Sequence, residues 1–113
     1  MSVRDLEQIA AEKSAADTLE QVLVRAVIGL AEEVGEVTRP IKRYLYRGER
    51  YRAEELMLEV GDVLYNCARL AVKHGYTLDQ VAAMTAAKYR ARAEQEPRAH
   101  RAVLESGAAG KQE

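Results

Sequence analysis

Two pairs of acidic residues with the same spacing are the part of the sequence whose residue types could do chemistry. Glu33 and Glu36 form one pair, Glu59 and Asp62 the other, each three residues apart. Residues three apart lie on one face of a helix, so each pair presents two carboxylates in the same direction. Carboxylate oxygens are hard ligands, and neither pair contains His or Cys. The pairs therefore indicate a site for Mg²⁺, with Mn²⁺ as a second possibility, rather than for zinc.

The apolar residues beside these acids predict how the two pairs meet. Each acid immediately precedes a residue of an apolar seam with alternating steps of four and three, typical of helix packing. The seams are Leu23, Val27, Leu30, Val34, Val37 and Ile41, and Leu56, Val60, Val63, Cys67 and Leu70. In an antiparallel hairpin turning beside Gly48, Glu33 is level with Asp62, and Glu36 with Glu59. Four such carboxylates repel one another unless a cation compensates their charge. A single acidic pair is common on a solvated helix face, and it is the matching register of the two pairs that favours a metal site.

Basic residues between the acidic pairs suit a phosphate ligand. The segment 39–52 contains a single acid, Glu49, and six basic residues: Arg39, Lys42, Arg43, Arg47, Arg50 and Arg52. A cation site flanked by such side chains suits a polyphosphate, and we take Lys42 and Arg43 as candidate substrate contacts. A second basic segment, KYRAR, places Lys88 and Arg92 on one helical face as further candidates. The alternative for both clusters is solvated surface charge.

The elements that must position these residues are predicted to be helices throughout. The sequence is rich in helix-forming residues, and it has no alternating strand pattern. We expect helices over 3–12, 16–46, 52–74 and 78–95. Ser14 with Asp17 is the predicted start of the second helix, Gly48 and Gly75 are predicted stops, and Thr77 with Gln80 predicts a capping box for the fourth. Pro40 should kink or interrupt the second helix. The fold class is all-α, with a single domain over 1–96 and a partly disordered C-terminal extension over 97–113.

Length and charge bound the class of protein. A chain of 113 residues that is 48% hydrophobic suits one domain with a modest core, and subunits of this size often extend that core by forming homo-oligomers. The formal charge of −1 gives no reason to expect a nucleic acid polymer as partner. No window resembles a signal peptide or a membrane span, so we expect a cytoplasmic protein without a membrane partner. The one cysteine, Cys67, excludes an internal disulfide.

The motifs resemble a known family. GLAEEVGEV, then EVGDVLYNCARLA, HGYTLDQV and KYRAR are similar, in type, order and spacing, to the MazG-type all-α nucleotide pyrophosphohydrolases over about residues 26–92. The resemblance implies a four- to five-helix bundle completed by homo-oligomerisation as a dimer or tetramer. It also implies that the four acids bind Mg²⁺ while a nucleoside triphosphate is hydrolysed to monophosphate and pyrophosphate.

Two further roles follow from the implied reaction. Glu32, next to Glu33, is our candidate for the base that takes a proton from the attacking water, and the alternative is that it only faces solvent. Many relatives with a closely similar motif have glycine at the position of Glu32, so this residue cannot be the base throughout the family. Asn66, one turn after Asp62, is a candidate contact for a base or sugar edge, and the alternative is a hydrogen bond to a neighbouring helix.

Three functions are compatible with this pattern. The first is a Mg²⁺-dependent pyrophosphohydrolase of ribo- or deoxyribonucleoside triphosphates, with a role in nucleotide-pool cleaning. The second is phosphoribosyl-ATP pyrophosphohydrolase, whose family has similar acidic motifs. The third is a non-catalytic helical oligomerisation or regulatory module in which the acids bind a structural ion or a basic partner. The EVGD and KYRAR segments favour the first.

Overall fold

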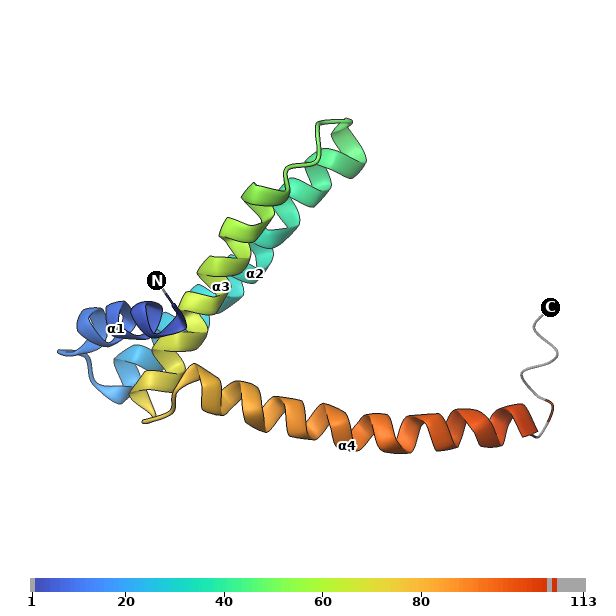
Figure 1. The fold of residues 1–113 in the computed structure, drawn as a ribbon. Coiled ribbons are helices and arrows are strands. Elements are labelled where there is room, and N and C mark those ends of the chain that lie inside the picture. Colours follow the sequence, from blue (N-terminus) through green and yellow to red (C-terminus); the bar gives the residue numbers. More distant parts are fainter. Residues whose placement is uncertain (1, 106, 108–113) are drawn as a thin grey trace. The chain divides into compact units, whose positions relative to one another are not determined.

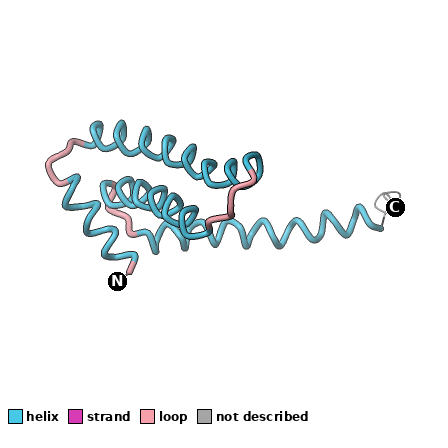
Figure 2. The backbone as a smooth tube through the Cα atoms, turned by 90° about the horizontal axis from the view of Figure 1, so that it is seen from above, coloured by secondary structure: helices cyan, strands magenta, loops and turns pink. Residues whose placement is uncertain are grey.

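Four helices make up the part of the chain that the structure describes. This computed structural model describes the backbone of residues 2–105 and 107, and the side chains of residues 2–96 and 107. The helices are α1 (Val3–Ser14), α2 (Leu19–Arg47), α3 (Ala53–Lys73) and α4 (Leu78–Glu105). These described residues contain no strand, as Figure 2 shows, so the predicted all-α class is confirmed for them. The chain divides into two compact units, Met1–Leu78, with α1 to α3, and Asp79–Glu113, with the rest of α4.

Capping boxes fix where the first two helices begin. In α1, the Ser2 hydroxyl accepts a hydrogen bond from the Arg4 backbone N–H, at 3.2 Å. In α2, Thr18 Oγ1 accepts from the Gln21 N–H at 3.2 Å, and Gln21 Oε1 accepts from the Thr18 N–H at 2.9 Å. The predicted start signal at Ser14 and Asp17 was therefore wrong. Thr18 caps α2 because it has a glutamine three residues later to complete the reciprocal pair.

An antiparallel hairpin of α2 and α3 is the main packing unit of residues 2–78. The two helices lie side by side in Figure 1. Gly48 ends α2 in the left-handed conformation, with φ of +65°, and its N–H donates to the Arg43 carbonyl. Glycine adopts this conformation without a steric penalty, which explains why the turn begins where the sequence predicts. Below the turn, an ion pair at 2.8 Å between Arg43 Nη2 and Glu55 Oε1 joins the two helices.

The core of this unit is small. Helix α1 packs against α3. The buried apolar residues there are Ala10, Ala68, Ala71 and Leu78, with Leu6, Tyr65 and Cys67 against them. In α2, Val22 and Ala26 are fully buried. Because most of these side chains are alanine, the helices approach closely but bury little apolar surface.

Two predictions about the helices can be compared with the structure. Pro40 does not interrupt α2, which continues as one helix to Arg47 with Pro40 buried inside it. Proline removes only one hydrogen bond, to the Glu36 carbonyl, and the turns on both sides remain helical. Helix α4 begins at Leu78, directly after Thr77 as predicted, but it runs through Pro97 to Glu105 instead of ending at residue 95.

The structure bears on only part of the prediction for the C-terminal extension. The boundary between 1–96 and 97–113 stays a prediction, although the backbone remains helical into the second range. Residues 106 and 108–113, which are seven of the seventeen residues in the predicted extension, lie outside the described residues. Among the described residues, no helix combines the length and the apolar character that crossing a membrane requires.

Candidate functional site

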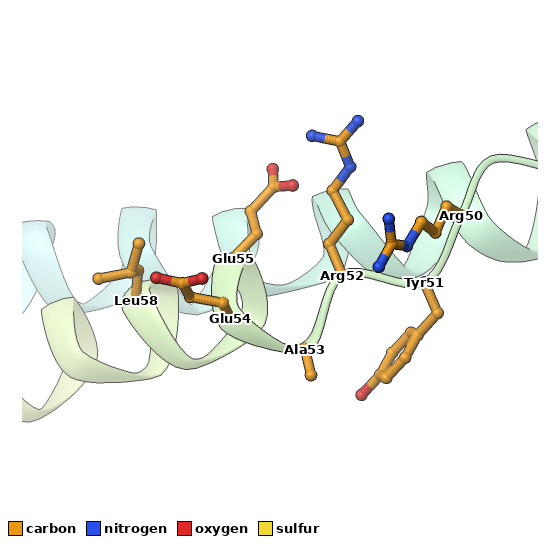
Figure 3. A pocket seen from close by; sticks show the side chains of 7 residues that line it. All are labelled: Arg50, Tyr51, Arg52, Ala53, Glu54, Glu55 and Leu58. Atoms are coloured by element: carbon orange, nitrogen blue, oxygen red, sulfur yellow. The ribbon is translucent and has the colours of Figure 1, made fainter.

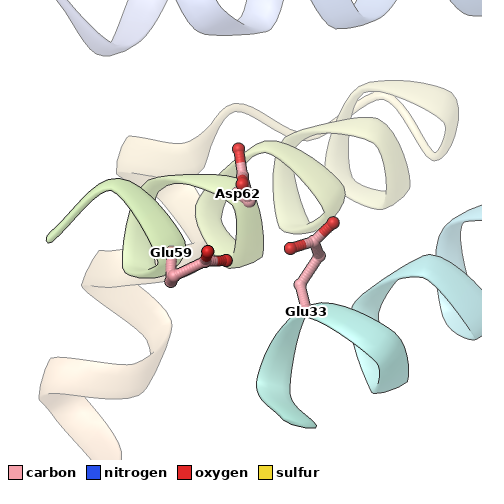
Figure 4. A group of neighbouring side chains, drawn as sticks. All are labelled: Glu33, Glu59 and Asp62. Atoms are coloured by element: carbon pink, nitrogen blue, oxygen red, sulfur yellow. The ribbon is translucent and has the colours of Figure 1, made fainter. Parts of the chain in front are cut away.

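Three acidic side chains from α2 and α3 converge on one another. Glu33 extends from α2, and Glu59 and Asp62 extend from α3, as Figure 4 shows. One carboxylate oxygen from each lies within 4.8 Å of those of the other two. This is the arrangement that the antiparallel register predicts, because Glu33 and Asp62 occupy level positions on the two helices. We call Glu33, Glu59 and Asp62 the acidic cluster.

The burial of the acidic cluster leaves oxygen atoms without partners. Glu33 Oε2 and Glu59 Oε2 are buried and have no hydrogen-bond partner within the described part of the chain. A buried carboxylate oxygen without a partner is costly, and a bound cation would supply that partner. Oxygens bound to one Mg²⁺ at about 2.1 Å lie about 3 Å apart when adjacent and about 4.2 Å apart when opposite, so the three oxygens would draw closer together to share one ion. The acidic cluster therefore fits a small divalent cation in donor type, and its oxygens are near enough for side-chain rotation to close the site.

The electrostatics of Glu33 reflect the same arrangement. Burial raises the pKa of Glu33 above its ordinary value of 4.5, and the negative charges of Glu36, Asp62 and Glu59 raise it further. Without a cation, Glu33 therefore holds its proton to a higher pH than an isolated glutamate does.

Glu36, the fourth predicted ligand, lies outside the acidic cluster. Its Oε1 is 3.6 Å from Arg39 Nη2, one turn further along α2. Its carboxylate nevertheless lies close enough to raise the pKa of Glu33. The structure thus brings together three of the four predicted ligands, and it places the fourth beside them in an ion pair on its own helix.

The predicted basic contacts lie toward the hairpin turn. Lys42 is exposed and lines an open pocket of about 330 Å³ with Arg39, Arg43, Tyr46 and Arg47. Arg43 is also paired with Glu55, a partner that the sequence prediction missed. The available signal was positional, since Glu55 lies close to the level of Arg43 in the predicted hairpin.

A larger pocket of about 790 Å³ lies where the turn leads into α3. It is lined by Arg50, Tyr51, Arg52, Ala53, Glu54, Glu55 and Leu58, whose side chains are drawn in Figure 3. Both acidic and basic side chains line it, and the residues of the acidic cluster do not. Its mixed charge makes it a poorer match to a polyphosphate than the surface around Lys42.

Asn66 is engaged within the protein. It is only 5% exposed, its Nδ2 donates to the Asp62 carbonyl at 3.1 Å, and its Oδ1 accepts from Arg69 Nη1 at 3.2 Å. Both hydrogen bonds lie within α3, whereas the alternative prediction was a bond to a neighbouring helix. A contact between Asn66 and substrate would require these hydrogen bonds to be exchanged. Arg69 is a residue of this network that the sequence prediction did not identify.

The other candidates are exposed. Glu32 is exposed on α2, directly before the Glu33 of the acidic cluster. On α4, Lys88 Nζ lies 5.3 Å and Arg92 Cζ 5.4 Å from the centroid of the Tyr89 ring. These cation–π contacts hold two positive charges on one face of α4. The roles predicted for Glu32, Lys88 and Arg92 stay predictions.

Comparison with known proteins identifies the family. A family model described as the MazG nucleotide pyrophosphohydrolase domain matches residues 21–96. Searches of curated proteins and of solved structures gave no match. The family match covers more than half of the chain and includes both acidic pairs, and the described helices carry those pairs on one hairpin. The chain belongs to the MazG nucleotide pyrophosphohydrolase family.

Proposed function

We propose that this protein is a Mg²⁺-dependent pyrophosphohydrolase that converts ribo- or deoxyribonucleoside triphosphates to the monophosphate and pyrophosphate. The observation that carries the proposal is the acidic cluster, in which three carboxylates from two helices lie within 4.8 Å of one another. Two of its oxygens are buried without a partner, as expected of ligands that await a cation. Membership of the MazG family supplies the reaction class.

The acidic cluster, joined by Glu36, would hold the cation. Mn²⁺ suits the same oxygen donors as Mg²⁺. A divalent cation held there would polarise the α-phosphoryl group and would neutralise the charge of the departing pyrophosphate. For Glu36 to join, its carboxylate would move from Arg39 toward Glu33, and Arg39 would then be free to contact phosphate.

The remaining chemistry belongs to the side chains around the acidic cluster. The water oxygen forms a bond to the α-phosphorus while the bond between that phosphorus and the α–β bridging oxygen breaks, and pyrophosphate leaves with the electron pair. Glu32 is the proposed acceptor of the water proton, since it is exposed and directly precedes Glu33. Lys42, exposed on the basic pocket of α2, is the proposed partner for phosphate oxygens.

Self-association is part of the proposal. Large apolar side chains are exposed along α2 and α3 of the single chain, among them Val24, Val27, Ile28, Met57 and Leu58. A surface of this kind is more common in subunits of oligomers than in monomers. We therefore propose a homodimer or homotetramer, in which a second copy of the chain covers these residues.

The reaction is tested by measuring pyrophosphate release, with orthophosphate release as control. The substrates are ribo- and deoxyribonucleoside triphosphates and phosphoribosyl-ATP, each with Mg²⁺, with Mn²⁺ and with EDTA. We expect pyrophosphate to appear only with a divalent cation, and more rapidly from the nucleoside triphosphates than from phosphoribosyl-ATP. Folded protein that binds Mg²⁺ but releases pyrophosphate from none of these compounds would contradict the proposal and favour the non-catalytic module.

A further inference from the structure

Among the described glycines, Gly29 has the least room for a side chain, because the side chain of Asn66 lies against it. A Cβ atom added to Gly29 would lie 2.8 Å from Asn66 Oδ1 and 3.4 Å from Asn66 Cγ. Cβ atoms do not approach oxygen to 2.8 Å, so a side chain at position 29 would force a shift. The Asn66 amide thus packs directly against the bare backbone of α2.

Asn66 cannot move aside without losing other contacts. It is buried, and both ends of its amide are hydrogen-bonded, one to the Asp62 carbonyl and the other to Arg69. Displacing a buried amide leaves these groups unpaired. An added methyl group at Gly29 would therefore either break this network or push α2 away from α3.

The contact lies one helical turn from the acidic cluster on both helices. Gly29 is four residues before Glu33, and Asn66 is four residues after Asp62. The two residue pairs occupy successive levels of the same antiparallel register, so the separation of α2 and α3 at one level constrains the separation at the next. Asn66 also bonds the backbone carbonyl of Asp62 itself. A change at this contact would therefore affect the acidic cluster in two ways. It would alter the distance between α2 and α3, and it would alter the hydrogen bond to the backbone of Asp62.

We propose that Gly29 and Asn66 are positioning residues that hold α2 and α3 at the separation at which Glu33 meets Glu59 and Asp62. The inference rests on the proposed metal site and adds to it the reason for a glycine inside α2. Glycine in a helix interior costs about 1 kcal/mol relative to alanine, and here the close approach of Asn66 offsets that cost. The proposal assigns neither residue a contact with the substrate.

The test is the affinity for Mn²⁺, measured by titration and electron paramagnetic resonance, together with urea unfolding in EDTA. We expect Gly29→Ala to weaken Mn²⁺ binding by about tenfold or more, in the range found when residues that orient metal ligands are changed. Gly35→Ala is the matched control. It adds the same methyl group to the same helix, at a position where no atom other than its chain neighbours and the adjacent backbone of α2 lies within 4 Å. It should leave Mn²⁺ affinity within about twofold of wild type.

A double-mutant cycle separates positioning from general packing. In the Asn66→Ala background the amide is absent, so adding Gly29→Ala should change Mn²⁺ affinity by less than about twofold. This arm remains informative even if Gly29→Ala alone does not fold. A tenfold loss that persists in the Asn66→Ala background would overturn the proposal.

Two further outcomes distinguish this proposal from the proposed function. Gly29→Ala that unfolds at lower urea but binds Mn²⁺ as wild type does would show a purely structural contact and overturn the positioning role. Wild-type protein that binds Mn²⁺, with the expected losses in the variants, but hydrolyses no triphosphate would support positioning while the proposed reaction fails. Wild-type protein that binds no Mn²⁺ would overturn both.

Discussion

Glu33 is the residue of the acidic cluster at which burial and nearby negative charges disfavour the ionised form. It is partly buried, one of its oxygens has no partner within the described residues, and three other carboxylates act on it. Each of these conditions disfavours its charged form. A bound divalent cation would compensate for them, because the unpaired oxygen would become a ligand of the ion and the ion's charge would oppose the repulsion. In the proposed site, the same carboxylate therefore disfavours the metal-free fold and would favour cation binding.

The raised pKa of Glu33 predicts how metal-free stability depends on pH. Above about 4.5, the ordinary value, the folded state still holds a proton that the unfolded state has released. The contribution of Glu33 to the free energy of unfolding is therefore fully present below about pH 4.5, and it is lost as the pH rises through the raised pKa of the folded state. Glu33→Gln removes this ionisation, so in EDTA the variant's free energy of unfolding should fall less over that interval. The measurement is urea unfolding of both proteins between pH 4 and 8. The prediction would be contradicted if their free energies of unfolding changed with pH by the same amount.

Glu36 and Asp62, two of the other proposed metal ligands, give a prediction about turnover. Glu36→Gln and Asp62→Asn each remove a charge that is proposed to hold the cation, and each should lower pyrophosphate release at least about 100-fold. Helical content by circular dichroism should be unchanged, because both substitutions are nearly isosteric. Glu20→Gln, which removes an exposed acid in the first turn of the same helix, is the control. Turnover retained in either ligand variant would remove that residue from the site.

At the scale of the elements, the hairpin sets the geometry of the acidic cluster. Gly48 fixes where α2 ends, and the register that follows places Glu33 level with Asp62. The ion pair between Arg43 and Glu55 lies between this turn and the acidic cluster. A turn that varied in conformation would leave this register undefined, whereas a left-handed glycine at the end of a helix fixes where the turn begins.

Two glycines of the hairpin should respond in opposite directions to the same substitution. Gly48→Ala places a Cβ at a φ of +65° and should destabilise the protein by about 1 kcal/mol. Gly35→Ala lies in a helix interior, where the new methyl group meets no atom within 4 Å other than its chain neighbours and the adjacent backbone of α2, and it should stabilise the protein by up to about 1 kcal/mol. The urea concentration at the midpoint of unfolding, measured at one protein concentration, should therefore be lower than wild type for Gly48→Ala and higher for Gly35→Ala. A loss of stability in Gly35→Ala would show that another chain packs against that position.

At the scale of the whole molecule, the single chain leaves much apolar surface uncovered. The buried core is mostly alanine, whereas Val24 and Ile28 on α2 are 58% and 55% exposed. Small cores of this kind give little stability by themselves, and association with a second copy would add to the buried area. Stability and assembly are then linked through protein concentration.

Self-association gives the fourth prediction. Light scattering coupled to size-exclusion chromatography should report a mass of two or four chains for the wild-type protein. The Val24→Glu/Ile28→Glu variant, which places two charges on the exposed apolar stripe of α2, should shift the mass toward one chain and lower the unfolding temperature. A wild-type protein that is monomeric at micromolar concentration would contradict the proposed assembly.

The sequence by itself determined the helical class, the end of α2 at Gly48, the register of the hairpin and the family. These depend on signals that act between neighbours along the chain, such as the spacing of apolar residues and the conformational freedom of glycine. Because helices are regular, spacing along the sequence fixes direction in space. The level positions of Glu33 and Asp62 follow from that regularity together with the turn at Gly48.

Only the tertiary structure decided what each side chain does once the helices have met. It directed Glu36 toward Arg39, paired Arg43 with Glu55 and packed the Asn66 amide against Gly29. It also showed α2 passing through Pro40 without interruption. These outcomes depend on side-chain torsions and on contacts between residues that are distant in sequence, where several partners compete for one group. Spacing shows which carboxylates can meet, and packing decides which of them do.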